Sequence, residues 1–179
     1  MKLLIKNIQC PQEAGEDSKR YMASRESCYW KIGVFVSDVD LARERIIRSG
    51  TAVSPASQFL EVGYLCHLTD PAGFTIELLQ HTFQKNFVKP APDDSLALGQ
   101  TASIGNITTR STNIDKSLEL YQDKLGMKLL SIQEISPYGF TLYFLGFTDD
   151  VPPHDDLNSV DNREWLWQRP YTTLEIQFK

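Results

Sequence analysis

The sequence has little of what marks secreted, membrane-spanning or nucleic-acid-binding proteins. Its three cysteines, Cys10, Cys28 and Cys66, are an odd number without CxxC spacing. This argues against a disulfide framework or a cysteine zinc site and favours a reducing, cytoplasmic setting. No apolar run approaches the roughly 18 residues that cross a bilayer, so no membrane partner is expected. The apolar run at positions 3–5 is too short for the core of a signal peptide.

Basic charge is also scarce. The chain carries 18 lysines and arginines against 23 acidic residues, a net charge of −5. This balance excludes a generally basic nucleic-acid binder. The 179 residues, 41% of them hydrophobic, suffice for a sizeable core in one domain or two small ones.

Hydrophobic periodicity predicts one strand–helix–strand–strand–strand unit in the first half of the chain. The pattern indicates a buried strand at 30–36, a helix at 37–50 and a weak strand at 51–60 that is broken near Pro55. Two further strands, at 61–70 and 73–80, are joined by Asp-Pro-Ala-Gly, a strong turn signal. The order is βαβββ.

The same order recurs in the second half. Strands are predicted at 103–111, 127–135, 140–147 and 172–178, with a helix at 114–126 after the first of them. The helices of the two copies align, each with an aspartate in its first turn and a closing glycine. An internal repeat of this kind predicts an α+β fold of two βαβββ modules, 29–83 and 101–179, each of which needs the other to cover its sheet.

Three segments lie outside the repeat. Residues 1–28 form an N-terminal extension, with a candidate strand at 1–9 and a loop or ragged helix at 11–20. Residues 84–100 contain two prolines and no period, as expected of a linker. The second module carries an insertion at 148–170, whose acidic stretch around His154 is interpreted as a solvated loop. Its tryptophans are expected to be packing residues.

Particular stretches of the repeat resemble the vicinal oxygen chelate superfamily, which includes glyoxalase I, extradiol dioxygenases and bleomycin-resistance proteins. In the second module SLELYQDKLGMKLL, FTLYFLGF and EWLWQRPYTTLEIQF are similar to glyoxalase I. In the first, HLTDPAGFTIELLQ resembles the closing hairpin of the family, DPxGxxIEL. The resemblance covers roughly 29–179, and the module that resembles the front of glyoxalase I comes second here.

The resemblance implies that the sheets of the two modules form one curved-sheet cup with a divalent metal in it. Each module would provide a first-strand ligand and a last-strand carboxylate. The carboxylates are present as Glu77 and Glu175, which are also the candidate catalytic residues. The first-strand positions depart from the family: the histidine or glutamine of the second module falls on Asn106, and the histidine of the first falls on Lys31. A protonated lysine has no acceptor and cannot ligate a metal.

The positions that meet glutathione in the family are matched only in part. Arg110 matches an arginine that meets the glutathione carboxylate, whereas a second such arginine falls on Ser27 and an asparagine falls on Lys179. The resemblance therefore implies substrate contacts for Arg110, and Lys31 and His67 are the other candidates.

Two hypotheses address the altered metal positions. Two glutamates that face one cavity repel each other unless a cation lies between them, so Lys31 could replace the metal and pair with Glu77. Alternatively, Glu77, Glu175, His67 and Asn106 form a shifted metal site. A type I turn with a bulge at Gly73 would put His67 opposite Glu77. A plain two-residue turn would put Cys66 there instead.

Three functions follow as alternatives. The first is a glyoxalase-like lyase or isomerase with a divalent metal, Zn, Ni, Mn or Fe, in which Glu77 moves a proton. The second is a metal-free small-molecule-binding protein like the bleomycin-resistance branch. The third is an inactive relic whose own side chains fill the cup. The expected partner is a small-molecule ligand, with no nucleic acid, and a homodimer is compatible with the linker length.

Overall fold

A computed structural model describes residues 27–91 and 96–179 of the chain. The candidate strand at 1–9 and the candidate loop or ragged helix at 11–20 lie outside the described residues.

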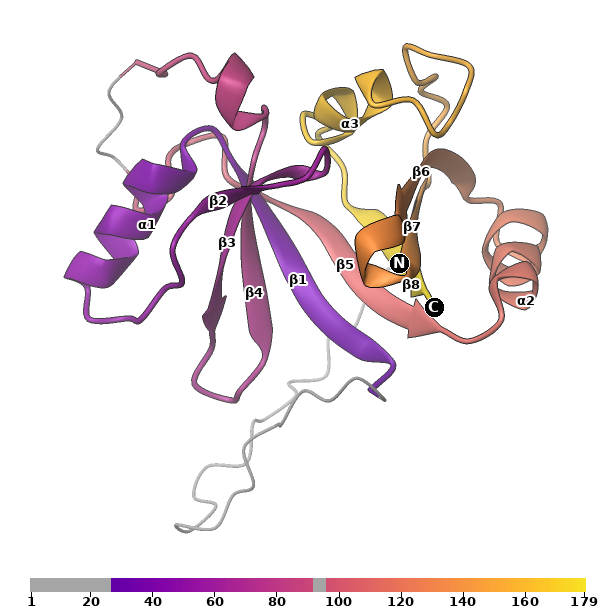
Figure 1. Ribbon diagram of the computed structural model, residues 1–179, viewed down its shortest axis with the longest axis horizontal. Coiled ribbons are helices and arrows are strands. Elements are labelled where there is room, and N and C mark those ends of the chain that lie inside the picture. Colours follow the sequence, from indigo (N-terminus) through magenta and orange to yellow (C-terminus); the bar gives the residue numbers. More distant parts are fainter. Residues whose placement is uncertain (1–26, 92–95) are drawn as a thin grey trace, which may run out of the picture.

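The described residues contain the predicted βαβββ order twice (Figure 1). The first copy comprises β1 (Tyr29–Val36), α1 (Val39–Arg48), β2 (Ser57–Phe59), β3 (Gly63–Thr69) and β4 (Thr75–Gln80). A 3-10 turn, η1 (Gln84–Asn86), follows. The second copy comprises β5 (Ser103–Ser111), α2 (Ile114–Leu118), the π-helical turn η2 (Glu119–Lys124), β6 (Lys128–Ile135), the 3-10 turn η3 (Ser136–Tyr138), β7 (Phe140–Gly146), α3 (Asp161–Leu166) and β8 (Thr173–Phe178).

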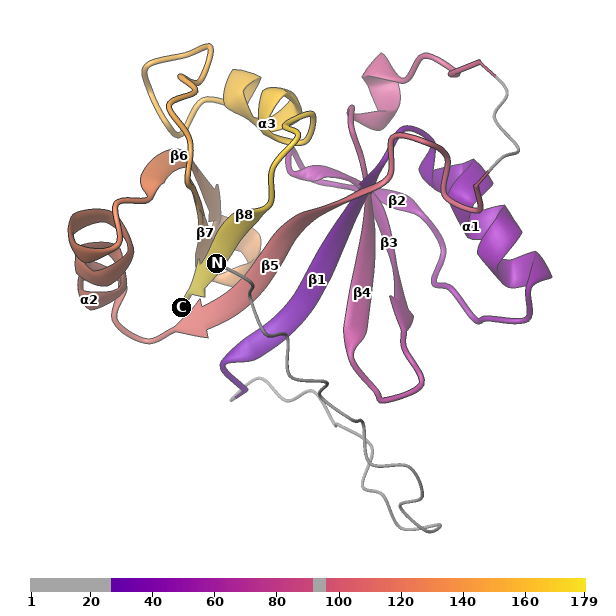
Figure 2. The ribbon, with the colours of Figure 1, turned by 180° about the vertical axis from the view of Figure 1, so that it is seen from behind.

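All eight strands join one curled sheet in the order β2-β3-β4-β1-β5-β8-β7-β6 (Figure 2). The first strands of the two copies, β1 and β5, pair antiparallel at its centre. Each of them also pairs in parallel with the last strand of its own copy, β4 or β8. The four strands that the family resemblance singled out for function therefore lie side by side in the middle of the sheet.

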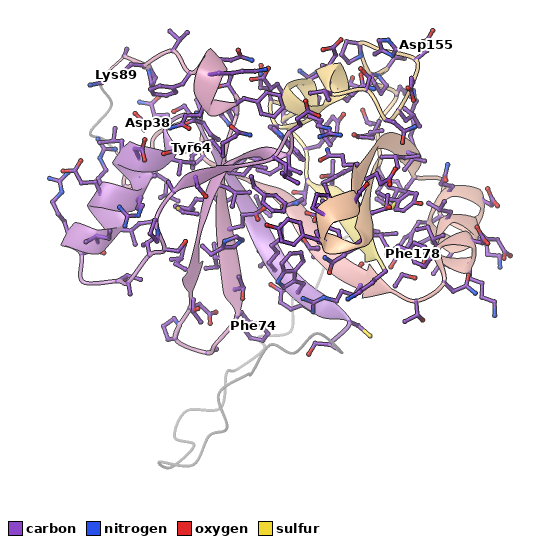
Figure 3. All side chains as sticks on the ribbon, viewed as in Figure 1. Asp38, Tyr64, Phe74, Lys89, Asp155 and Phe178 are labelled. Carbon is purple, nitrogen blue, oxygen red and sulfur yellow. The ribbon has the colours of Figure 1, made fainter. Side chains whose placement is uncertain are left out.

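Helix α1 packs on the face of the sheet opposite the cup. Asp38 lies at its start (Figure 3). The side chain caps the helix, since it accepts a hydrogen bond of 2.9 Å from the Leu41 amide. Val39 and Ala42 are buried against a cluster from β1, β3 and β4 that includes Tyr64. Because side chains alternate along a strand, this packing leaves the other face of β3 and β4 for the cup.

Two predicted elements differ in detail from the structure. The weak strand at 51–60 reduces to the three residues of β2 and an isolated bridge between Val53 and Leu68, because Pro55 has no N–H donor to continue the ladder. The insertion interpreted as a solvated loop contains α3, in which Asn162 and Arg163 are buried.

This insertion holds the two copies together. Arg163 Nη1 donates a 2.7 Å hydrogen bond to the carbonyl of Glu61, and Trp167 Nε1 donates one of 2.9 Å to the carbonyl of Val62. The Trp167 ring packs edge-on against Phe35 of β1 and Phe144 of β7, with centroids 5.3 and 5.2 Å away. The insertion therefore ties the β2–β3 turn of the first copy to the core that Phe35 and Phe144 share.

We expect Trp167→Phe to lower the free energy of unfolding by about 1 to 3 kcal/mol, because the Val62 carbonyl loses its donor in a buried place. The matched control is Trp165→Phe, since Trp165 is only partly buried and stacks on Arg169 at 4.7 Å. Urea unfolding measures both variants. Equal losses in the two would contradict a tie through Trp167.

Candidate functional site: a lysine between two glutamates

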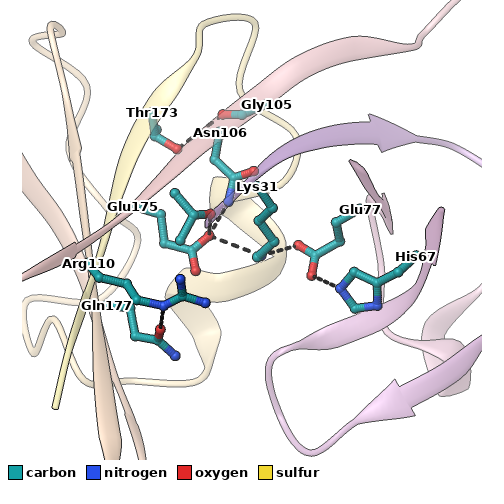
Figure 4. A network of polar contacts seen from close by, with 10 residues as sticks. Lys31, His67, Glu77, Gly105, Asn106, Arg110, Thr173, Glu175 and Gln177 are labelled. Atoms are coloured by element: carbon teal, nitrogen blue, oxygen red, sulfur yellow. Dashed lines mark hydrogen bonds and ion pairs between the residues drawn. The ribbon is translucent and has the colours of Figure 1, made fainter. Parts of the chain in front are cut away.

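The strand register brings the candidate residues together on the concave face. Lys31 of β1 lies opposite Thr108 of β5, and Thr108 lies opposite Glu175 of β8. In the neighbouring row, Gly33 lies between Asn106 on one side and Glu77 on the other. Figure 4 shows the side chains converging above the central strands.

Lys31 is the centre of the cluster. Its Nζ lies 2.6 Å from Glu77 Oε1 and 3.4 Å from Glu175 Oε2, and the residue is 4% exposed. The sequence-based hypothesis that Lys31 pairs with Glu77 is thus confirmed, and the lysine also contacts the second glutamate.

Glu175 is held by neighbours from β5. Thr108 Oγ1 donates a 2.9 Å hydrogen bond to its Oε2, and Asn106 Nδ2 donates to the same oxygen. Sequence reasoning missed Thr108. The alternation of Asn106, Thr108 and Arg110 along one strand was the signal that could have found it, since such residues share a face.

Glu77 is held by His67 from the neighbouring strand. His67 Nε2 and Glu77 Oε2 are 3.0 Å apart, and the two residues are a cross-strand pair. The predicted turn is confirmed, because the Asp70 amide donates to the Phe74 carbonyl at 2.9 Å and Gly73 has a φ of 98°. Cys66 points to the opposite face, where burial raises the pKa of its thiol to about 11.

The cluster contains the Lys31 ammonium group and two carboxyl groups, and the charge of each shifts the pKa values of the others. Burial works against the charge of Lys31, but the two glutamates outweigh it and raise the pKa of the ammonium group. Burial disfavours the charge of Glu77 as well, yet Lys31 and His67 lower its pKa to about 2. The pKa of Glu175 is raised, by burial and by the negative charge of Glu77, despite the pull of Lys31.

A glycine at position 33 is a condition for this geometry. A Cβ built on Gly33 would lie 1.6 Å from Asn106 Oδ1 and 2.7 Å from its Cγ. Only hydrogen leaves room for the Asn106 amide between β1 and β5. The missing side chain therefore determines where Asn106 lies, and through it one of the contacts to Glu175.

Arg110 lies further along β5 than Asn106 and Thr108, and unlike them it is only partly buried. Its Nε donates a 3.0 Å hydrogen bond to Gln177 Oε1, and Nη1 donates one of 3.1 Å to the Ser27 carbonyl. The guanidinium also lies 4.9 Å from the centroid of the Trp30 ring. Trp30 and Gln177 were not among the sequence-based candidates.

The cup encloses a cavity of about 630 Å³, a size typical of small-molecule sites. Its polar lining includes Lys31, His67, Glu77, Asn106, Arg110 and Glu175, which are all six of the sequence-based candidates. Its apolar walls come from both copies and include Phe59, Leu65, Leu79, Leu142, Phe144 and Trp167. The cavity thus combines charged and polar side chains on one part of its lining with apolar walls on the rest.

The residues present do not fit a divalent metal as they stand. Lys31 Nζ is bonded to both carboxylates that would be ligands, and a protonated lysine offers donors only. Within the described ranges, 27–91 and 96–179, no group of three or more His, Cys, Asp or Glu side chains could hold a metal ion.

No helix in the ranges 27–91 and 96–179 is long and apolar enough to span a membrane.

Comparison with known proteins identifies relatives by sequence. Residues of this chain are 44% identical to glyoxalase I of Saccharomyces cerevisiae over 64 positions, 34% of this chain and 19% of the yeast protein. The lactoylglutathione lyase of Haemophilus influenzae is 48% identical over 40 positions, 22% of this chain and 30% of that protein. No family model matches the chain.

A solved structure supports the same fold. Glyoxalase I from Zea mays superposes with a TM-score of 0.57 at 18% identity, over 86% of this chain and 43% of the maize chain. This chain therefore spans less than half of the maize structure, and the matched stretches cover less than a third of either curated relative.

Fold and sequence matches together support the resemblance to the vicinal oxygen chelate superfamily. The sequence matches described above are to proteins named glyoxalase I and lactoylglutathione lyase.

We expect Lys31→Met to cost about 3 to 5 kcal/mol of unfolding free energy at neutral pH, because two carboxylates would remain buried without a cation. The ion pair contributes fully above the ordinary pKa of Glu77, 4.5, and below that of Lys31, 10.5. Its contribution is lost as the pH falls from 4.5 through about 2. The difference between wild type and variant should therefore shrink in acid.

Urea unfolding across this pH range measures the effect, with the exposed Lys116→Met as control. Lys31→Met/Glu77→Gln should recover part of the loss and provides a folded sample if the single variant is too unstable. A cost at neutral pH no larger than that of the control would contradict the ion-pair assignment.

Proposed function

We propose that the cup is a glyoxalase-type small-molecule site that works without a divalent metal, with the Lys31 ammonium group supplying the positive charge between Glu77 and Glu175. One observation carries the proposal: Lys31 Nζ lies 2.6 Å from one carboxylate and 3.4 Å from the other. A cation is needed there, since two buried carboxylates repel each other.

An ammonium group can also serve a ligand. It has three N–H bonds, of which two are engaged by the glutamates. The third is available to a ligand oxygen or to the Trp30 ring, whose centroid is 4.9 Å from Nζ. Lys31 would thereby polarise an oxygen of the ligand, as a hydrogen-bond donor rather than a Lewis acid.

The size and lining of the cup support binding rather than a purely structural role. A cavity of about 630 Å³ argues against a relic whose own side chains fill the space. Arg110, Lys179 and His67 line the same cavity. We propose that they contact the oxygen-rich part of the ligand, with the apolar walls around its carbon skeleton.

A second candidate is a divalent-metal-dependent lyase. The observation that favours it is the sequence identity to proteins named glyoxalase I and lactoylglutathione lyase. In this case Glu77, Glu175, His67 and Asn106 would be the ligands, and Lys31 would have to leave the glutamates. Glu77 would then be the proton-transferring group.

Metal content separates the two candidates. Tag-free protein is dialysed against nickel, zinc, manganese or iron(II), and bound metal is measured by elemental mass spectrometry. We expect wild type to hold far less than one ion per chain, because the ammonium group occupies the space between the carboxylates. Lys31→His replaces a donor by a ligand and should raise the metal content towards one ion per chain.

The matched control is Lys116→His, an exposed position on α2. Near-stoichiometric metal in wild type that is lost in Glu77→Gln or Glu175→Gln would overturn the metal-free proposal in favour of the lyase.

A further inference from the structure

Glu77 and Glu175 differ in the contacts that their two carboxylate oxygens make. Glu77 has a partner on each oxygen, Lys31 on Oε1 at 2.6 Å and His67 on Oε2 at 3.0 Å. Both of its oxygens are therefore committed within the protein, and its role is that of a fixed counter-ion.

Glu175 directs all its contacts through one oxygen. Lys31, Thr108 and Asn106 all donate to Oε2, the first two at 3.4 and 2.9 Å. Within 27–91 and 96–179, nothing donates to Oε1. The residue is 1% exposed, so this oxygen is buried beside the cavity that Glu175 lines. A buried acceptor without a donor is costly, and it favours any donor that can reach it.

The surroundings of Glu175 indicate the kind of ligand. Glu175 lines the cup, and Phe144 is its cross-strand partner on β7 and lines the same cavity. The next pair along these strands, Leu142 and Gln177, lines the cavity too. In Figure 4 the Glu175 carboxyl group lies between Asn106 and Arg110. An apolar surface thus adjoins an acceptor that has no donor.

Building on the proposed metal-free site, we infer that Glu175, through Oε1, is the glutamate that contacts the ligand. The ligand class is a molecule with a hydrogen-bond-donating hydroxyl group at one end and an apolar body along Phe144 and Leu142. Glu77, which the family resemblance marks for proton transfer, stays with Lys31 and His67.

Paired probes test this inference. 2-Naphthol carries a hydroxyl donor on a flat apolar body, and 2-methoxynaphthalene is the same body with an acceptor only. Ligand-observed NMR at about pH 8 gives both dissociation constants, and this pH favours the ionised carboxylate because burial raises the pKa of Glu175. We expect wild type to bind the naphthol at least about tenfold more tightly than the ether.

Glu175→Gln should abolish the preference without abolishing binding. The glutamine carbonyl has to accept from Thr108, Asn106 and Lys31, which turns its NH₂ group to the former Oε1 position. That position then donates, and both probes can accept from it. Glu134→Gln, an exposed change on β6, is the control and should keep the wild-type preference.

Three outcomes would overturn the inference: equal binding of both probes by wild type, an unchanged preference in Glu175→Gln, or binding of neither probe by wild type. These outcomes are independent of the metal content, and it is the metal content that tests the proposed function. A preference that is lost in Glu175→Gln, with retained binding of the ether, supports it.

Discussion

Two carboxylates buried in one cup need a cation between them, and this requirement governs the centre of the molecule. The ion–ion distances of 2.6 and 3.4 Å show that Lys31 meets it from within the chain. Other polar side chains of the cluster contact the two glutamates. His67 satisfies the far side of Glu77, and Thr108 and Asn106 hold Glu175. The chemistry open to the cup depends on whether that cation is an ammonium group or a metal.

The position of Lys31 follows from the topology rather than from a flexible loop. The first strands of the two copies pair at the centre of the sheet, and the last strand of each copy flanks them. Residues far apart in sequence are thus brought to adjacent register positions on rigid strands. Gly33 adds a local condition, since only a residue without a side chain leaves space for Asn106. A site that is built on strands in this way is preorganised, because its side chains are held by packing and hydrogen bonds.

Much of the architecture could be predicted from the sequence, because the repeat and the hairpin turn are local signals. The βαβββ order appears twice as expected. The bulge at Gly73 determined the register that puts His67 opposite Glu77. These features depend on turn chemistry and alternation, which act over a few residues.

Other features depend on distant contacts, and for that reason the sequence could not reveal them. Helix α3 lies in an insertion rich in proline and acidic residues, and it is held by carbonyls of the β2–β3 turn about a hundred positions earlier. Likewise, no sequence pattern distinguishes the two oxygens of Glu175. Their unequal use emerges only when Lys31, Thr108 and Asn106 meet in three dimensions.

The central claim is that the Lys31 ammonium group, and not a metal ion, lies between the two glutamates. The most direct test is anomalous diffraction from crystals of wild-type protein grown with nickel or zinc. We expect no anomalous peak between Glu77 and Glu175, and electron density for Lys31 that reaches both carboxylates. A strong metal peak bound by these glutamates, with Lys31 turned away, would contradict the claim.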